Sequence, residues 1–567
     1  MTREERLVNT AFHSCSSEKY WEDRIRQIFW IVGILAGATL TYTTRHFING
    51  DAINYIEMGE AFRQANVRDF VNLTASPGYA VLLGLTQSLL NTNPWTEIPL
   101  LKGVNFVLLL IGMWACDFLL RSLRKSYAPL SDKGMLLPWF MIMALAYAMF
   151  LFCALVWITP KLVAPDMATF STTLLSMAMI LQIRENPQSY RPYLWLGVLL
   201  GIAYLFKTFF FSFSLIFLGA AVIACGSIQR AIPRITLALV SMILVSALWI
   251  IPLSMKLGTL SYGETGPLNY AIYVKAEGKG RYCPVILDDR PEVLLYKTDF
   301  VEKCTRPATF DPSYWKVGMK PVFDLKIHLT LVFEHALQIC SDKPWLFLAV
   351  LIWIAWNITA GGFRFRESGT FVIPLYLVVP SLVGILMYSV IHVEMRYIAP
   401  FIFLVFLGVV LCLRYDTNHS SMKNGVIGAF GMLAVILVLL ALSVIDQSIR
   451  GSISGGTKPT YKEAYSELFA VKDYLQDQGL QPGDQVAVIG YPPIYWARIS
   501  GVKISAEIPN EKEMMSATVE DRKKALATLR PAGVNAVVVK GKEFAGLIAE
   551  GWKLIPGTRD FYAFTFR

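Results

Sequence analysis

Long apolar stretches alternate with shorter polar ones along the first 445 residues of the chain. Each apolar stretch approaches the roughly 20 residues that an α-helix needs to cross a bilayer. The region 192–227 is too long for one span, so we expect a hairpin that turns at Lys207. The pattern predicts eleven spans, at about 27–44, 97–120, 135–158, 167–183, 192–207, 208–227, 235–254, 345–362, 370–391, 397–413 and 424–445.

The composition agrees with an integral membrane protein. Of the 567 residues, 54% are hydrophobic and 17% are charged, against about 25% charged in typical soluble proteins. The net charge of +10 does not indicate nucleic-acid binding, because Lys and Arg gather in short loops between spans. Positively charged loops mark the cytoplasmic side, which then also holds residues 1–26. The loops are 121–126, 184–191, 229–234 and 364–366.

An odd number of spans places the C-terminus outside the cytoplasm, and the larger polar regions fall on that side too. We therefore predict a polytopic α-helical membrane domain over 27–445, with its N-terminus inside, and outer loops at 45–96 and 255–344. A linker at 446–459 leads to an extracytoplasmic domain at 460–567.

Residues 460–567 have the pattern of a small α/β domain, in which helical periodicity alternates with β-branched runs. A purely structural cap, a lid over a site and acceptor recognition remain alternative roles for this domain. The expected helices lie at 461–479 and 520–533, and the expected strands at 485–490, 534–541 and 561–566.

The cysteines divide by compartment. Cys283 and Cys304 share the large outer loop, where oxidation is permitted, and we expect them to form a disulfide. Cys340 is an alternative partner. No cysteine spacing resembles a zinc site.

Three groups of ionisable residues fall at the predicted outer membrane face. Asp51 follows the first span, and Lys161 and Asp166 occupy the short turn before the fourth. His392, Glu394 and Arg396 precede the tenth span. Ionisable residues that converge at one membrane face indicate a site for a polar substrate. A simpler explanation is a helix N-cap at Asp51 and a favourable dipole interaction at Asp166.

These residue types suit the transfer of a sugar from a lipid phosphate. Arg396, Lys161 or Lys207 would bind the phosphate and stabilise its charge, although Lys207 also fits a snorkelling residue at a helical turn. Asp51 would take a proton from the acceptor, with Asp166 as a second catalytic acid. The expected substrate-lining residues are Tyr55, Tyr262, Glu264, His392 and Glu394; Tyr262 and Glu264 fit loop structure equally well.

Several short motifs, taken in order, resemble the GT-C superfamily of integral-membrane glycosyltransferases. They are similar above all to the protein O-mannosyltransferase and aminoarabinose transferase group, which includes bacterial members of unassigned substrate. The resemblance covers about residues 27–415. The motifs are TRHFINGDAINYIEMGEAF, SPGYAVLLGLTQSLL, APDMATFSTTLLSMA, LGIAYLFKTFF and EMRYIAPFIFL.

The resemblance implies catalytic acids at Asp51 and Asp166 and a sugar donor carried on polyprenyl phosphate. It also implies helices at 52–65 and 77–90 that lie along the membrane surface, and a bacterial inner membrane as the location. Many members of the family carry paired acids in the first outer loop, whereas Ala52 follows Asp51 here. We therefore expect no obligatory metal, and a divalent cation held by Asp51 and Asp166 stays open because hard cations take several oxygen ligands.

Two other functions remain alternatives to this glycosyltransferase. One is a ligase that moves a preassembled glycan from a lipid pyrophosphate, and the other is a transporter or flippase of lipid-linked sugars. A transporter would carry ionisable residues along the interior of its spans, whereas this chain carries most of them at span ends. The pattern favours the enzyme and identifies neither the sugar nor the acceptor, whether lipid, glycan or protein.

Overall fold

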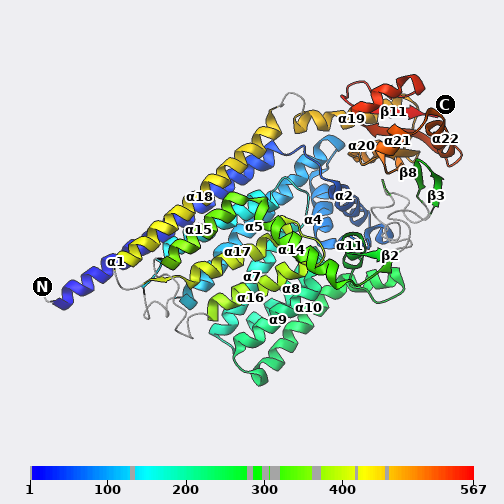
Figure 1. The fold of residues 1–567 in the computed structure, drawn as a ribbon. Helices are drawn as coiled ribbons and strands as arrows, with labels where there is room; N and C mark the ends of the chain where they lie inside the picture. Colours follow the sequence, from blue (N-terminus) through cyan, green and yellow to red (C-terminus); the bar gives the residue numbers. More distant parts are fainter. Residues whose placement is uncertain are drawn as a thin grey trace.

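A computed structural model describes most of the chain as a helix bundle with a mixed α/β domain at one end (Figure 1). The described residues are 3–127, 135–277, 285–296, 305–306, 320–359, 372–415, 419–453 and 459–566. The predicted disulfide between Cys283 and Cys304 lies outside the described residues.

Seven helices in the described residues are long and apolar enough to cross a membrane. An eighth span results if α14 (Leu325–Asp342) and α15 (Pro344–Thr359), which meet at 92°, are counted together. The seven are α1 (Arg3–Thr43), α5 (Pro94–Tyr127), α6 (Trp139–Phe152) with its π-helical continuation η2 (Cys153–Ile158), α7 (Asp166–Glu185), α10 (Ile228–Leu257), α17 (Met395–Cys412) and α18 (His419–Ser452).

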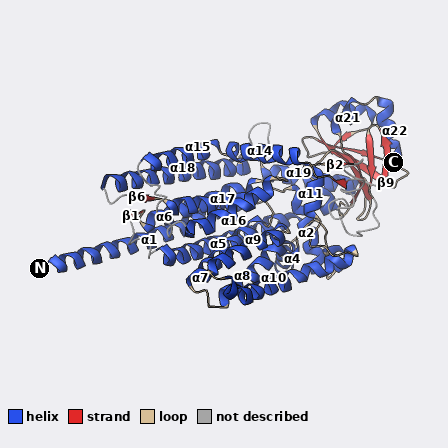
Figure 2. Ribbon diagram, turned by 60° about the horizontal axis from the view of Figure 1, so that its bottom comes forward, coloured by secondary structure: helices blue, strands red, loops and turns tan. Residues whose placement is uncertain are grey.

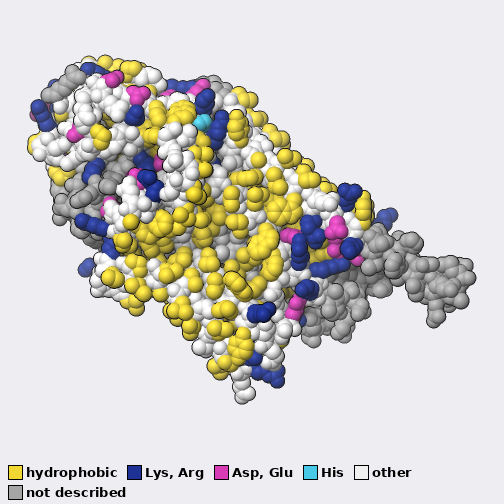
Figure 3. All heavy atoms as spheres, turned by 180° about the vertical axis from the view of Figure 1, so that it is seen from behind, with side chains coloured by type: hydrophobic (Ala, Val, Ile, Leu, Met, Phe, Trp, Pro, Cys, Tyr) yellow, Lys and Arg dark blue, Asp and Glu magenta, His cyan; other side chains and the backbone are white. Residues whose placement is uncertain are grey.

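Three shorter apolar helices complete the bundle: α8 (Arg191–Phe206), α9 (Phe209–Cys225) and α16 (Val372–Ser389). Each of the eleven predicted apolar stretches falls on one of these helices, and the predicted break at Lys207 is confirmed. The protein is thus an integral membrane protein, and the number of eleven full spans stays a prediction. Hydrophobic side chains cover the middle of the bundle in Figure 3, as a lipid-facing surface requires.

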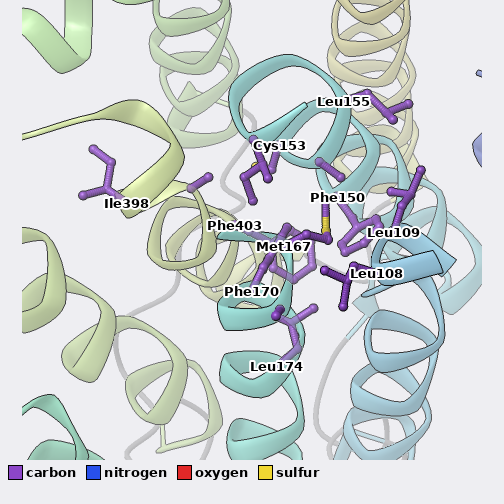
Figure 4. Packing of buried hydrophobic residues seen from close by; sticks show 14 of the residues in the cluster. Leu108, Leu109, Phe150, Cys153, Leu155, Met167, Phe170, Leu174, Ile398 and Phe403 are labelled. Carbon is purple, nitrogen blue, oxygen red and sulfur yellow. The ribbon is translucent and has the colours of Figure 1, made fainter. Parts of the chain in front are cut away.

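Aromatic and aliphatic side chains from α5, α6, α7 and α17 form the centre of the bundle (Figure 4). The rings of Phe150 and Phe170 stack with their centroids 5.1 Å apart, and Phe403 meets Phe170 edge-on at 5.7 Å. Such close packing fixes helices against one another. It therefore also fixes the first residues of α7 and α17, which carry two of the predicted site residues.

The first outer loop forms short helices, as predicted: α2 (Gly50–Arg63), α3 (Val67–Phe70) and α4 (Pro77–Leu90). The helices α2 and α4 cross at Gly59 and Gly84. A Cβ atom at Gly59 would lie 2.8 Å from the carbonyl oxygen of Ala80, so only glycine permits this approach. The close crossing holds α2, and hence Asp51, in a fixed position.

The C-terminal domain contains a seven-stranded sheet in the order β10-β11-β9-β7-β8-β4-β3 (Figure 2). The strand β7 runs parallel to β8 and β9, and the remaining pairs are antiparallel. The strands are β3 (Val285–Asp289), β4 (Glu292–Leu295), β7 (Gln485–Ile489), β8 (Lys503–Ile508), β9 (Val534–Lys540), β10 (Lys553–Leu554) and β11 (Phe561–Thr565). The helices are α19 (Tyr461–Asp477), α20 (Tyr495–Ser500), α21 (Glu511–Ser516), α22 (Val519–Leu529) and the 3₁₀ segment η3 (Lys542–Glu550).

All five elements predicted in 460–567 are present as α19, β7, α22, β9 and β11. The prediction missed β8, and it did not anticipate that β3 and β4 come from the outer loop 255–344. The helix α18 continues to Ser452, beyond the predicted start of the linker at 446. Two segments therefore connect the membrane helices to the C-terminal domain: the outer loop that carries β3 and β4, and the chain that follows α18.

The N-terminal end of α1 and the C-terminal domain lie at opposite ends of the bundle (Figure 1). The predicted orientation, with the N-terminus inside and the C-terminal domain outside, stays a prediction. We call the end that carries the C-terminal domain the domain end. It also carries α2, α4 and α11 (Thr265–Tyr273). Two small ladders connect loops: β2 (Ala276–Glu277) pairs with β5 (Lys320–Pro321) beside α11, and β1 (Met135–Leu136) pairs with β6 (Arg414–Tyr415) at the other end of the bundle (Figure 2).

Candidate active site

Asp51 lies in the first turn of α2, and its side chain is 62% exposed. The N-cap residue of α2 is Asn49, so the interpretation of Asp51 as an N-cap is wrong. The Asn49 amide instead accepts a hydrogen bond from the backbone N–H of Val163 at 2.9 Å and donates one to its carbonyl at 3.4 Å. These two bonds fasten the start of α2 to the turn that precedes α7.

Asp166 is the first residue of α7, and its side chain is only 3% exposed. Lys207, in the break between α8 and α9, donates a hydrogen bond to Oδ1 of Asp166 at 2.7 Å. The guanidinium Nη1 of Arg396 lies 3.7 Å from Oδ2 of the same carboxylate. A buried carboxylate needs such partners, because removing a charge from water is costly unless the charge is paired.

Arg396, near the start of α17, joins the two acids. Its Nη2 lies 3.4 Å from Oδ2 of Asp51, while its Nη1 faces Asp166. Asp51, Asp166, Lys207 and Arg396 thus form one cluster of two acids and two bases, which we call the acid–base cluster. Its members come from four segments that are far apart in the sequence.

Tyr397 is a member of this site that the sequence interpretation missed. The ammonium of Lys207 lies 3.4 Å from the centre of its ring, and Arg396 donates to its hydroxyl at 3.3 Å. An aromatic face stabilises a nearby cation. Its position directly after Arg396, at the end of a span, was the available signal.

Tyr55 lies one turn after Asp51 on α2, and its ring meets Tyr79 edge-on at 5.3 Å. Burial raises the pKa of the Tyr55 hydroxyl well above its usual value, and the charges of Asp51 and Asp166 raise it further. The phenol is therefore a neutral hydrogen-bonding group beside the acid–base cluster, as the prediction of a lining role requires.

His392 and Glu394 lie just before α17. His392 Nε2 is 3.6 Å from Glu394 Oε1, and the imidazole stacks on the ring of Tyr273 at 4.0 Å. The neighbouring His392 lowers the pKa of Glu394, and Arg396 lowers it further. This pair lies beside the acid–base cluster.

Three other predicted site residues, Lys161, Tyr262 and Glu264, have described contacts to residues outside the acid–base cluster. The ammonium of Lys161 lies over the rings of Phe47 and Tyr461, at 4.1 and 5.0 Å. Tyr262 stacks on Phe211 of α9 at 5.0 Å, and its carbonyl accepts a hydrogen bond from Tyr204. Glu264 precedes α11 and accepts a hydrogen bond from Ser261 at 2.9 Å.

The donor groups of the described residues bear on metal binding. Within these residues, no three His, Cys, Asp or Glu side chains are grouped to hold an ion. Both oxygens of Asp166 already face Lys207 or Arg396, and Asp51 faces Arg396. The acid–base cluster therefore places cationic side chains where its two carboxylates converge.

The comparisons with known proteins concern the fold. No protein-family model matches the sequence, and no curated protein matches it. The crystal structure of ArnT from Cupriavidus metallidurans in the apo state matches with a TM-score of 0.51 and 13% identity, over 94% of this chain and 97% of that one. The chain has the fold of ArnT.

The structure of the same ArnT bound to undecaprenyl phosphate matches equally, with a TM-score of 0.51, 12% identity and the same coverage of both chains. An oligosaccharyltransferase from Archaeoglobus fulgidus, in complex with Zn and sulfate, gives a TM-score of 0.43 at 10% identity. That match covers 92% of this chain and 69% of that one, and its TM-score is too low to establish a common fold.

A second charged cluster joins the membrane domain to the C-terminal domain. Arg498 of α20 binds both oxygens of Glu97, at 2.9 and 3.2 Å. It also lies 2.9 Å from Glu60 and 4.0 Å from Glu57, both on α2. We call Glu57, Glu60, Glu97 and Arg498 the interdomain cluster. The sequence interpretation missed it: Glu57 and Glu60 stand in the first quoted motif, but no local pattern pairs them with Arg498, which lies 401 residues from Glu97.

Proposed function

We propose that this protein is a glycosyltransferase that moves a sugar from a polyprenyl-phosphate donor to an acceptor at the domain end of the bundle. The observation that carries the proposal is the acid–base cluster, in which an exposed carboxylate shares one arginine with a buried carboxylate. The GT-C fold supports it, because ArnT with this fold was crystallised bound to undecaprenyl phosphate.

The two acids have different roles in this mechanism. Asp51 is exposed and takes a proton from the acceptor hydroxyl or amine as general base. The acceptor atom then attacks the anomeric carbon of the sugar. Asp166 is buried between Lys207 and Arg396, and it holds these two cations in place.

The leaving group is the polyprenyl phosphate. As the bond from the anomeric carbon to the phosphate oxygen breaks, the electron pair stays on that oxygen. Arg396 and Lys207 stabilise the resulting charge, since charge-assisted hydrogen bonds to phosphate are strong. Arg396 is held loosely, at 3.4 Å from Asp51, so an arriving phosphate displaces Asp51 from it and frees the base.

An apolar cavity supports a donor with a long hydrocarbon chain. It has a volume of about 240 Å³ and includes Met395, the residue before Arg396. A polyprenyl chain seated there would have its phosphate next to the start of α17. The other lining residues are Met149, Trp157, Ile339, Lys343, Leu346, Phe347, Val350, Trp353, Ile354, Ile402, Val405, Phe406 and Val409.

The proposed setting is a bacterial inner membrane, with the acid–base cluster and the C-terminal domain on the extracytoplasmic side. Charge placement in the short loops and the opposite positions of the N-terminus and the C-terminal domain support this orientation. The transferred sugar is a hexose or pentose carried on one phosphate.

The test is an assay of purified protein in lipid with a panel of polyprenyl-phosphate sugars and a membrane extract as the source of acceptors. Release of free polyprenyl phosphate is measured for the wild type and for Asp51→Asn. We expect release by the wild type and a loss of about 10²–10⁴-fold in kcat for the variant, the usual contribution of a general base. Donor binding should persist in the variant.

A matched control is Asp446→Asn. Asp446 is also an exposed aspartate that pairs with an arginine, Arg450, at 2.9 Å near the end of α18. We expect full activity in this control. If no sugar donor gives release, the proposal is wrong. Release from pyrophosphate-linked glycans alone would indicate the ligase, and sugar-lipid movement without release would indicate the transporter.

A further inference from the structure

A polar cavity lies where the C-terminal domain meets the membrane domain. Its volume is about 390 Å³, within the range of small-molecule binding sites. The end of α2, the α4–α5 turn and α20 all contribute to its walls. The lining residues are Glu60, Arg63, Gln87, Asn91, Thr92, Asn93, Pro94, Glu97, Arg498 and Ile499.

Gln87 supplies an independent sign of a ligand. Its side chain is on α4, the residue is only 6% exposed, and its Nε2 donates to Glu97 at 2.9 Å. A carboxylate only accepts, so this bond fixes which end of the amide is nitrogen. The amide oxygen of Gln87 has no hydrogen-bond partner in the described part of the chain, and Gln87 lines the cavity. A buried acceptor without a partner is costly. The oxygen is itself covered by protein atoms, so it would accept a ligand hydroxyl once the side chain turns towards the cavity.

The walls of the cavity are held rigidly by both domains. The side chain of Asn93 accepts hydrogen bonds from the backbone N–H groups of Trp95 and Thr96, which fixes the start of α5. The carbonyl of Pro94 accepts two more, from Tyr465 at 2.8 Å and Tyr495 at 2.9 Å in the C-terminal domain. A preformed site loses little entropy when it binds a ligand.

The charges of the cavity favour a neutral ligand. Glu60 and Glu97 are matched by Arg63 and Arg498, and Arg498 is already occupied by carboxylates. Arg63 is 46% exposed and only 3.9 Å from Glu60, so its donors remain available. The amide of Asn91 offers both donors and an acceptor, and the Nδ2 of Asn93 adds further donors, since its oxygen already accepts from Trp95 and Thr96. Such a set matches a molecule with many hydroxyl groups.

We infer that this cavity binds a saccharide unit, and that this unit belongs to the acceptor. Glu60 follows Asp51 by nine residues on α2, a distance of about 14 Å along a helix. The saccharide in the cavity is therefore a distal unit, and the reacting group of the same acceptor reaches Asp51. The assignment to the acceptor rests on the proposed function, whereas saccharide binding by itself does not.

The test measures binding without any donor, using the full-length protein in phosphatidylcholine nanodiscs. One arm titrates neutral di- and trisaccharides of hexose and N-acetylhexosamine and follows saturation transfer by NMR. A second arm places the same saccharides on a diacylglycerol anchor in the nanodisc and follows retained glycolipid by native mass spectrometry. The two arms distinguish a free saccharide from a lipid headgroup.

The variants are Gln87→Met and Arg63→Gln, with Ser88→Ala as a matched control. Ser88 neighbours Gln87 on α4 but is exposed and lies outside the cavity lining. We expect a wild-type signal in at least one arm and a loss of about tenfold in affinity in each variant, since a hydrogen bond to a charged or buried group is removed. The control should bind as the wild type does.

Arg63→Gln decides the matter if Gln87→Met does not fold, because Arg63 is largely exposed. No saccharide signal in either arm, or equal binding by wild type and by the folded variants, would overturn the inference. Saccharide binding that persists while no donor supports transfer would leave the cavity assigned and the proposed function wrong.

Discussion

The helix α2 takes part in two charged clusters that use arginine in opposite ways. In the acid–base cluster, Arg396 lies 3.4 and 3.7 Å from its two carboxylates, and one of them, Asp51, is 62% exposed. In the interdomain cluster, Arg498 is 13% exposed and lies 2.9 Å from both Glu60 and Glu97. The first arginine has loose partners and the second has tight ones.

On the proposed function, this difference separates a site for chemistry from a structural contact between domains. A buried arginine with two-point contacts to carboxylates leaves no donor for a substrate, and its removal strands buried charge. A loosely paired arginine next to an exposed acid can exchange that acid for an incoming phosphate. Both clusters act on α2, so the interdomain cluster also helps to position Asp51.

The largest expected effect on stability comes from Arg498→Gln. Removing this cation leaves three carboxylates close together, and breaking a buried ion pair costs about 3–5 kcal/mol. We expect a clear fall in the melting temperature in nanodiscs. Arg450→Gln is the control, because Arg450 makes an exposed pair with Asp446 at 2.9 Å and should matter little. Equal melting temperatures for the two variants would contradict the structural role of Arg498.

Arg396→Gln should have the reverse profile. We expect a loss of about 10²–10³-fold in kcat/KM, as is usual when one group that stabilises a developing charge is removed. The melting temperature should change less than in Arg498→Gln. Arg450→Gln, at the end of α18, is the control with an exposed arginine. If Arg396→Gln loses stability and keeps its activity, the two clusters have been assigned the wrong way round.

Glu57 makes the stability of the interdomain cluster depend on pH. Burial raises the pKa of Glu57 from 4.5 to about 7, against the opposing effect of Arg498. Between pH 4.5 and about pH 7, the Glu57 carboxyl therefore keeps its proton in the folded protein, whereas the unfolded chain releases it. The contribution of Glu57 to the free energy of unfolding is complete below about pH 4.5. This contribution, about 3 kcal/mol, is lost as the pH rises through about 7.

The measurement compares unfolding of the wild type and Glu57→Gln from about pH 4 to about pH 8. Glutamine does not titrate, so the difference between the two curves isolates Glu57. We expect the wild type to lose stability relative to the variant as the pH rises. Parallel curves would show that Glu57 is ionised in the folded protein.

The smallest expected effect is that of chelation. Lys207 and Arg396 already face both oxygens of Asp166, which leaves fewer oxygen ligands than a hard divalent cation takes. Transfer activity should therefore survive EDTA. Loss of activity in EDTA and its recovery on added Mg²⁺ would be the opposing result. A strict requirement for a cation would mean that the acid–base cluster rearranges when the donor binds.

Much of the membrane domain was predictable from the sequence. The break at Lys207 followed from the length of an apolar stretch, the family resemblance implied the helix over 77–90, and both are present. Asp51, Asp166, Lys207 and Arg396 were all candidates, and the structure brings these four together. The sequence also suggested Lys161 as a phosphate ligand, whereas its described side-chain contacts are to Phe47 and Tyr461.

The sequence by itself determined where the apolar helices lie, which charges stand at their ends, and that an α/β domain follows them. These are local properties, set by hydropathy over one span and by periodicity over one helix or strand. Only the tertiary structure decided which acid meets which base. Asp51 and Arg396 are 345 residues apart, and Glu97 and Arg498 are 401 apart. No local pattern encodes such a pairing, because it depends on how packed helices bring distant segments to one point.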